Sequence, residues 1–169
     1  MKILALDLGT TTGYAMDDNG KRSLAGSWPL ATSKEVTAWG KTRLTRRQDP
    51  RPMRLFSKMT QLSEDTALPD IIVFEDVEFS TYTLQTQLWA ALRTAVWFWA
   101  HFRDIRHIDC VGVTTLKKFA TGHGGATKDM MLSALKKRWP GRETGCDDNA
   151  VDAIFLLEWA RTNLSRMKI

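Results

Sequence analysis

The end of the chain carries acidic residues at a spacing that could do chemistry. The stretch DDNAVDAIFLLEWA, residues 147–160, places three aspartates in the first turns of an otherwise apolar helix. At about 100° per residue, Asp148 and Asp152 lie on one face, whereas Asp147 points elsewhere and suits a helix cap. Two carboxylates at the edge of a core repel each other unless a cation or a shared proton intervenes. The Asp148/Asp152 pair therefore predicts a partner supplied by the rest of the chain.

Two further acids stand at the ends of apolar, β-rich runs. Asp7 closes the run KILALDL (2–8), and Glu75 lies near the end of IIVFEDV (71–77), a continuous apolar run typical of a strand buried on both faces. If these strands are parallel neighbours, their carboxyl ends lie side by side, where α/β sheets place their sites. The C-terminal helix would then bring its two aspartates over the same point.

Four carboxylates in one place suit hard divalent cations, which prefer oxygen ligands. The predicted set is Asp7, Glu75, Asp148 and Asp152, and the predicted cofactor is Mg²⁺ as a pair of ions, with Mn²⁺ as a possible substitute. Two such ions about 3.5–4 Å apart activate a water and stabilise the leaving oxygen of a phosphodiester. The residues thus predict hydrolytic phosphodiester cleavage. The competing interpretations are a turn residue at Asp7, a surface acid at Glu75 and shared capping at Asp148.

The bulk composition predicts one globular domain spanning residues 1–169. The chain is 43% hydrophobic and 25% charged, which suits a folded core with a wet surface. It shows no signal peptide and no apolar run near the roughly 20 residues of a membrane span. The two cysteines have no CxxC spacing, so neither a disulfide framework nor a zinc site is indicated. A cytoplasmic location is the expectation.

The charge distribution favours an anionic partner. The net charge is +5, and the stretch KTRLTRRQDPRPMR (41–54) concentrates six basic residues around one acid. It is interpreted as a mobile basic loop that runs into a helix, and binding to phosphates competes there with an ordinary solvated loop. A second cluster follows in the last third of the chain. The candidate phosphate-binding residues from both are Arg43, Arg46, Arg47, Arg51, Lys117, Lys118 and Lys128.

The pattern of apolar residues predicts an α/β fold with a mixed five-stranded sheet, three strands antiparallel and two parallel, and helices on both faces. The turn signal DDNG (17–20) joins the second strand to the third. The expected strands are 2–8, 9–16, 22–30, 71–77 and 104–113. The expected helices are 53–66, 84–102, 114–122, 126–139 and a last one beginning at Asp147.

The helix expected over 84–102 is apolar on every side, with Leu88, Leu92 and Trp99 on one stripe and Trp89 and Trp97 on others. A helix of this kind must be buried on more than one side. Two interpretations stay open. The helix packs on the sheet and against a second subunit, or it is wholly internal to one chain.

Four motifs in this order resemble the RuvC family of Holliday-junction resolvases, in the ribonuclease H-like superfamily. They are LALDLGTTTGYA with Asp7, IIVFED with Glu75, TGHGGATKDMM with Lys128, and DDNAVDAIFLL with Asp148 and Asp152. The resemblance implies a ribonuclease H-like fold and a homodimer formed through the 84–102 helix. It also implies an Mg²⁺-dependent endonuclease that cuts branched DNA by two symmetric nicks, with the acids as metal ligands. Small members of this kind resemble those encoded by bacteriophages.

The sequence departs from the family pattern at two points. The commoner spacing in the last helix is acid-x-x-acid, which would fall on Asn149. Asp148 is only about 40° from Asp152 around the helix and can substitute, whereas Asp147 is about 140° away. The family also carries an aromatic residue soon after the strand acid, where it contacts bases at the junction. Here FSTY offers Phe79 and Tyr82 in a shifted register.

Three other functions compete with a junction resolvase. DLGTTTG also resembles the phosphate-binding hairpin of sugar kinases and Hsp70-type ATPases, but those proteins close two such domains over a nucleotide, and no nucleotide cofactor is expected here. A non-catalytic DNA-binding protein would not need the four acids together. A less selective flap or fork nuclease would use the same metal chemistry, and the sequence leaves that alternative open.

Overall fold

The centre of the molecule is one mixed β-sheet in a computed structural model that describes residues 1–18, 23–42, 48–76, 83–142 and 144–163. The strand order is β3-β2-β1-β4-β5. The three N-terminal strands pair antiparallel, and β4 is parallel to both β1 and β5. The predicted mixed sheet is therefore confirmed. Its strands are β1 (Lys2–Asp7), β2 (Thr11–Asp18), β3 (Ser23–Pro29), β4 (Ile71–Asp76) and β5 (His107–Gly112).

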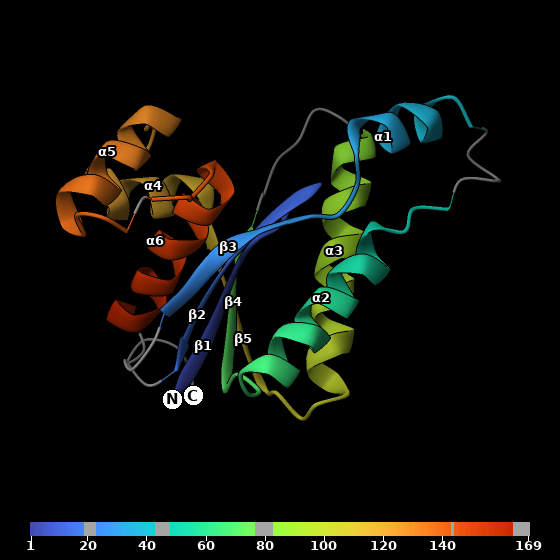
Figure 1. Cartoon of the computed structure of the whole chain (residues 1–169), viewed down its shortest axis with the longest axis horizontal. Helices are drawn as coiled ribbons and strands as arrows, with labels where there is room; N and C mark the ends of the chain where they lie inside the picture. The colour runs from blue at the N-terminus through green and yellow to red at the C-terminus, as the bar shows by residue number, and fades with distance from the viewer. Residues whose placement is uncertain (19–22, 43–47, 77–82, 143, 164–169) are drawn as a thin grey trace.

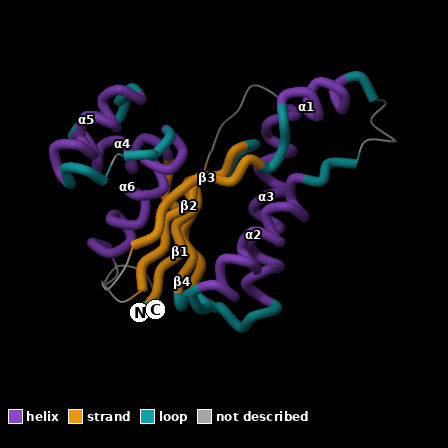
Figure 2. The backbone as a smooth tube through the Cα atoms, viewed as in Figure 1, coloured by secondary structure: helices purple, strands orange, loops and turns teal. Residues whose placement is uncertain are grey.

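Helices cover both faces of the sheet (Figure 1, Figure 2). Alternate strand residues feed two separate cores, because successive side chains of a strand point to opposite faces. Ile3 and Ala5 belong to the core under α4, α5 and α6, and Leu4 and Leu6 belong to the core under α2 and α3. The helices are α1 (Ser33–Gly40), α2 (Arg51–Asp65), α3 (Thr83–His101), α4 (Val113–Thr121), α5 (Lys128–Arg138) and α6 (Asp148–Asn163).

Three local features differ from the sequence prediction. The second strand begins at Thr11 rather than at residue 9, because the Thr12 hydroxyl donates to the Gly9 carbonyl at 3.1 Å and closes a turn there. Helix α1 was not predicted, although its capping box, in which Thr32 and Glu35 bond each other's backbone, is a recognisable signal in TSKE. The fifth strand begins at His107 rather than at residue 104. Asp104 adopts a left-handed conformation (φ 55°), which turns the chain after α3.

Helix α3 is buried on one side only. Leu92, Val96 and Trp99 are fully buried against the sheet and α2, whereas Trp97, Phe98 and Phe102 are 61%, 56% and 71% exposed. The wholly internal helix is therefore wrong for the single chain, and the second-subunit interpretation stays a prediction. Within the described ranges, no helix combines the length and the apolarity that crossing a bilayer requires.

Candidate active site

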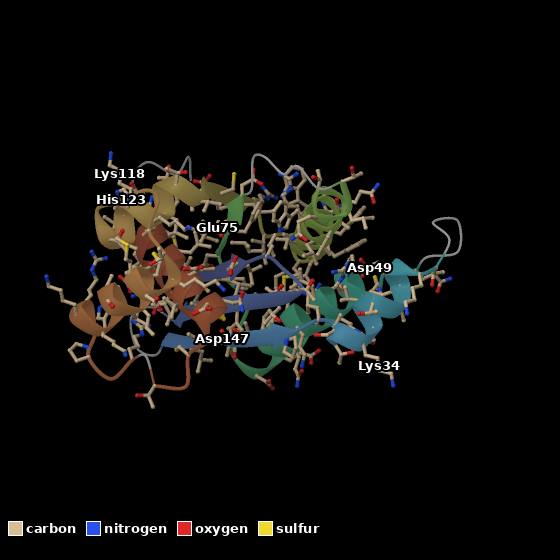
Figure 3. The ribbon with its side chains drawn as sticks, turned by 90° about the horizontal axis from the view of Figure 1, so that it is seen from above. Lys34, Asp49, Glu75, Lys118, His123 and Asp147 are labelled. Carbon is tan, nitrogen blue, oxygen red and sulfur yellow. The ribbon has the colours of Figure 1, made fainter. Side chains whose placement is uncertain are left out.

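Two acids meet where neighbouring parallel strands end. Leu6 of β1 is in register with Phe74 of β4, so the next residues, Asp7 and Glu75, are adjacent across the sheet. Both share a face with Ile3 and Ala5 and therefore point toward α6. Their carboxyl groups are hydrogen-bonded to each other. Figure 3 looks down on this end of the sheet and shows Glu75 in the middle of the molecule.

Helix α6 brings a third acid to the pair because its first turn lies directly on the sheet. Gly13 of β2 pairs with Asp7, and a Cβ atom at Gly13 would lie 2.0 Å from the Asn149 carbonyl oxygen. Only a residue without a side chain allows this approach, which sets Asp152 one turn further along, within charge range of Asp7 and Glu75. The sequence analysis missed Gly13. A glycine inside a strand pattern is a signal of close backbone approach.

The three acids perturb one another's protonation. Burial raises the pKa of Asp7 well above its ordinary value, and the charges of Glu75 and Asp152 raise it further. Burial and the Asp152 charge likewise raise the pKa of Glu75 to about 7. Burial raises the pKa of Asp152 to about 6, although the Lys117 ammonium opposes that shift. A proton shared in the hydrogen bond between Asp7 and Glu75 relieves the repulsion between these adjacent carboxyl groups.

The remaining two aspartates have separate surroundings at the start of α6. Asp147 caps the helix: its Oδ1 accepts from the Ala150 N–H at 2.9 Å and from the Ser27 hydroxyl. The predicted capping role of Asp147 is thus confirmed. Asp148 lies at the exposed rim, where its Oδ2 is 2.9 Å from the Lys128 Nζ. It contributes its charge to Asp152 but stands outside the hydrogen-bonded pair.

The donor chemistry of the site fits a hard divalent cation. Asp7, Glu75 and Asp152 supply carboxylate oxygens only, and their raised pKa values show that a positive charge would be stabilised among them. In the rotamers of this structure, the carboxylate oxygens of the three acids do not surround a common point. Over the described residues, no group of three or more His, Cys, Asp or Glu side chains is arranged as a metal site. The four-acid ligand set therefore stays a prediction.

The predicted DNA contacts fall into three groups. Lys117 on α4 acts on the charges of Glu75 and Asp152, and Lys128 is exposed beside Asp148. Lys118 is exposed on α4, and Figure 3 shows it at the edge of the molecule, away from Glu75. Arg51 instead lies inside the fold: its Nη2 is 2.6 Å from Asp49 and its Nη1 donates to the Thr10 hydroxyl at 2.8 Å. These bonds leave little of that guanidinium for a phosphate. The remaining predicted residues lie outside the described residues; they are Arg43, Arg46, Arg47, Phe79 and Tyr82.

The acid cluster should make the metal-free protein less stable as the pH rises. Acids whose folded pKa is raised contribute full stability below about pH 4 and lose it as the pH passes through their folded values. For Asp152 and Glu75 these values are about 6 and about 7. With a chelator present, the melting temperature is expected to fall by about 5 °C between pH 5 and pH 8, relative to the Asp7→Asn variant. Scanning calorimetry at both pH values measures the difference. A wild-type protein that gains stability relative to the variant over this range would contradict the assignment.

Comparison with solved structures identifies the architecture. No protein-family model matches the sequence, and a comparison with curated proteins finds no match. The chain superposes on Thermus thermophilus RuvC with a TM-score of 0.69 at 16% identity, covering 98% of this chain and 96% of that one. It superposes on T. thermophilus RuvC in complex with Holliday junction substrate with a TM-score of 0.68 at 18% identity, covering 96% of each chain.

A third solved structure shares the fold over most of its length. The yeast mitochondrial Holliday junction resolvase Ydc2 gives a TM-score of 0.53 at 14% identity, covering 91% of this chain and 75% of that one. At these identities the similarity establishes the fold. The chain thus has the ribonuclease H-like fold of the RuvC-type Holliday junction resolvases.

Proposed function

We propose that the chain is a Mg²⁺-dependent endonuclease that resolves Holliday junctions and related branched DNA by paired nicks. The observation that carries the proposal is the convergence of Asp7, Glu75 and Asp152 at the carboxyl ends of β1 and β4. Enzymes of open α/β sheets place their sites at this edge. The fold is shared with a RuvC that was solved with a Holliday junction substrate.

In this proposal each acid has a defined task. The metal is held by Asp7, Glu75 and Asp152. Asp148 becomes the fourth ligand when its side chain breaks its ion pair with Lys128. Bound Mg²⁺ would supply an activated water and stabilise the leaving oxygen of a phosphodiester. Lys117, already within charge range of Glu75 and Asp152, would balance the negative charge that a DNA phosphate adds to the pocket. Lys118 and Lys128 would contact the flanking backbone, which gives affinity without sequence reading.

Cleavage of a panel of labelled DNAs in Mg²⁺ tests the function. Four-way junctions should be cut by two symmetric nicks, and linear duplexes should stay intact under the same conditions. Equal cutting of Y-forks and four-way junctions would favour the less selective flap or fork nuclease. Binding of junctions without any cutting by the wild type would favour a non-catalytic DNA-binding protein.

The exposed face of α3 supports a homodimer. Trp97, Phe98 and Phe102 form an apolar patch, in which the rings of Phe98 and Phe102 stack with centroids 6.4 Å apart. Ile105 and Ile108 line a groove beside it. Contiguous exposed aromatic side chains of this kind mark protein interfaces. A two-fold dimer would present two acid clusters to opposite strands of a junction.

Replacing Trp97 by aspartate is expected to convert the dimer into a monomer at micromolar concentration, because a buried charge at the centre of an aromatic interface costs binding free energy. Sedimentation velocity measures the mass. Met53→Asp is the matched control, since Met53 is 67% exposed on α2 and away from the patch. A wild type that sediments as a monomer would exclude this interface.

At the start of α6 we assign Asp148 to the metal and Asp147 to the helix cap. Asp148→Asn is expected to lower cleavage by about a hundredfold while leaving the melting temperature nearly unchanged, because Asp148 is exposed and bonded only at the rim. Asp147→Ala is expected to lower stability by about 1 kcal/mol with a small effect on cleavage, because it removes a helix cap. Cleavage kinetics and thermal melts are measured on both variants. The reverse pattern would assign the metal to Asp147.

A further inference from the structure

The last two residues of β4 point to opposite faces of the sheet. Glu75 faces α6 with Asp7, whereas Asp76 has the orientation of Ile72 and Phe74, whose side chains lie in the core under α2 and α3. On that face, Arg93 of α3 donates from Nη1 to the Asp76 Oδ1 at 2.8 Å. Asp76, the residue after Glu75, is therefore bonded to helix α3 on the opposite face of the sheet.

Arg93 is the one charge that interrupts the apolar run 88–102 of the sequence. A charged residue on a buried helix costs desolvation unless it has a partner. Its side chain is 40% exposed and that of Asp76 is 23% exposed, so the pair lies at the edge of the core. An ion pair in such a place contributes little to global stability. The ion pair lies immediately beside the proposed metal site, where it can affect the position of Glu75.

We propose that Arg93 is a positioning residue that fixes the carboxyl end of β4, and with it the Glu75 carboxylate, through its bond to Asp76. The inference rests on the proposed nuclease function for its catalytic consequence. Strand β4 is in register with β1 only as far as Phe74, whereas it stays paired with β5 through Asp76, so Glu75 and Asp76 have a strand neighbour on one side only. The bond from α3 supplies a restraint there. Small displacements of a reacting group are costly, since about 1 Å can reduce a rate a hundredfold.

Charge balance is the competing use of Arg93. If the guanidinium only neutralises a surplus carboxylate near the DNA, then Asp76→Asn removes the need for it and should cleave as well as the wild type. If the bond positions β4, then Arg93→Gln and Asp76→Asn should be equally defective, and the double variant should be no worse than either. Arg93→Lys keeps the charge and part of the reach, and it should recover part of the activity.

The experiment combines two readouts on Arg93→Gln, Asp76→Asn, Arg93→Lys and the double variant. The first is the single-turnover rate of junction cleavage at saturating protein, expected to fall about tenfold in both single losses. Junction affinity in chelator is expected to change less than about twofold. The second is hydrogen exchange of the Phe74, Glu75 and Asp76 amides in the metal-free protein, expected to speed up in the same variants. Lys34→Gln is the matched control, since it also removes one positive charge and Lys34 is exposed on α1, outside the sheet and outside α3.

The outcomes separate this inference from the proposed function. Unchanged exchange at the end of β4 in Arg93→Gln, or a fully active Asp76→Asn, would overturn the positioning role. If the wild type cuts no junction, the nuclease proposal fails, and the exchange measurement still decides whether Arg93 fixes the strand. Faster exchange in Arg93→Gln, Asp76→Asn and the double variant but not in Lys34→Gln, together with the matching loss of rate, supports it.

Discussion

Asp7→Asn is expected to abolish junction cleavage, by about a thousandfold or more, while junction binding in chelator persists. Asp7 is hydrogen-bonded to Glu75, and its pKa is raised by burial and by the charges of both Glu75 and Asp152, so it interacts with both other acids of the site. An asparagine keeps the shape but removes the charge that would hold a divalent cation. Single-turnover cleavage and a gel-shift assay measure the two properties.

The thermal stability of Asp7→Asn tests whether a loss of cleavage results from unfolding. Removing one charge from the cluster relieves repulsion, so Asp7→Asn should melt at a higher temperature than the wild type in chelator at pH 8. Loss of cleavage therefore cannot result from unfolding. Asp65→Asn, an exposed residue at the end of α2, makes the same substitution far from the site and should remain active. A fully active Asp7→Asn protein would defeat the nuclease assignment.

Gly13→Ala is expected to destabilise the fold by about 3 kcal/mol or more and to lower cleavage at least as severely as the loss of one acid. The new Cβ would lie 2.0 Å from the Asn149 carbonyl oxygen, which is backbone and cannot rotate away. Helix α6 must then move off β2, at the cost of overpacking. Since α6 carries Asp152, that movement also separates the acid from Asp7 and Glu75.

Urea denaturation and cleavage kinetics of the same preparation test this prediction. Gly40→Ala is the matched control, because a Cβ atom at Gly40 in α1 meets nothing within 4 Å. It should leave both stability and cleavage nearly unchanged. A Gly13→Ala protein with wild-type stability would show that α6 is free to shift, and the proposed placement of Asp152 would lose its support.

Positioning by small and distant residues is a common theme of this site. Gly13 sets the depth of α6, the Asp147 cap sets its start, and the Arg93–Asp76 bond holds the far side of β4. None of these residues supplies a proposed ligand. Variants at Gly13 and Arg93 should therefore lower cleavage through geometry, and Asp147→Ala only slightly, whereas a variant at Asp7 changes the chemistry itself.

The sequence by itself determined the sheet and the acids that end its strands. Strand and helix periods, the DDNG signal and the apolar runs 2–8 and 71–77 were enough to predict the mixed sheet that the structure confirms. These patterns predict the elements correctly because burial of one face requires apolar residues at the repeat of a strand or of a helix, and that repeat is visible within each segment. The pairing of Asp7 with Glu75 followed from one further assumption, that β1 and β4 are parallel neighbours.

Only the tertiary structure decided how the remaining residues are used. On the apolar helix α3, Trp97 is exposed whereas Trp99 is buried. Side chains from other elements provide the partners of three polar residues: Ser27 for Asp147, Lys128 for Asp148 and Thr10 for Arg51. The close approach at Gly13 and the bond from Arg93 to Asp76 join residues far apart in the chain. A local pattern records the face on which a side chain lies. The residues that this side chain contacts depend on how distant elements pack together, and the local sequence of one element does not specify that packing.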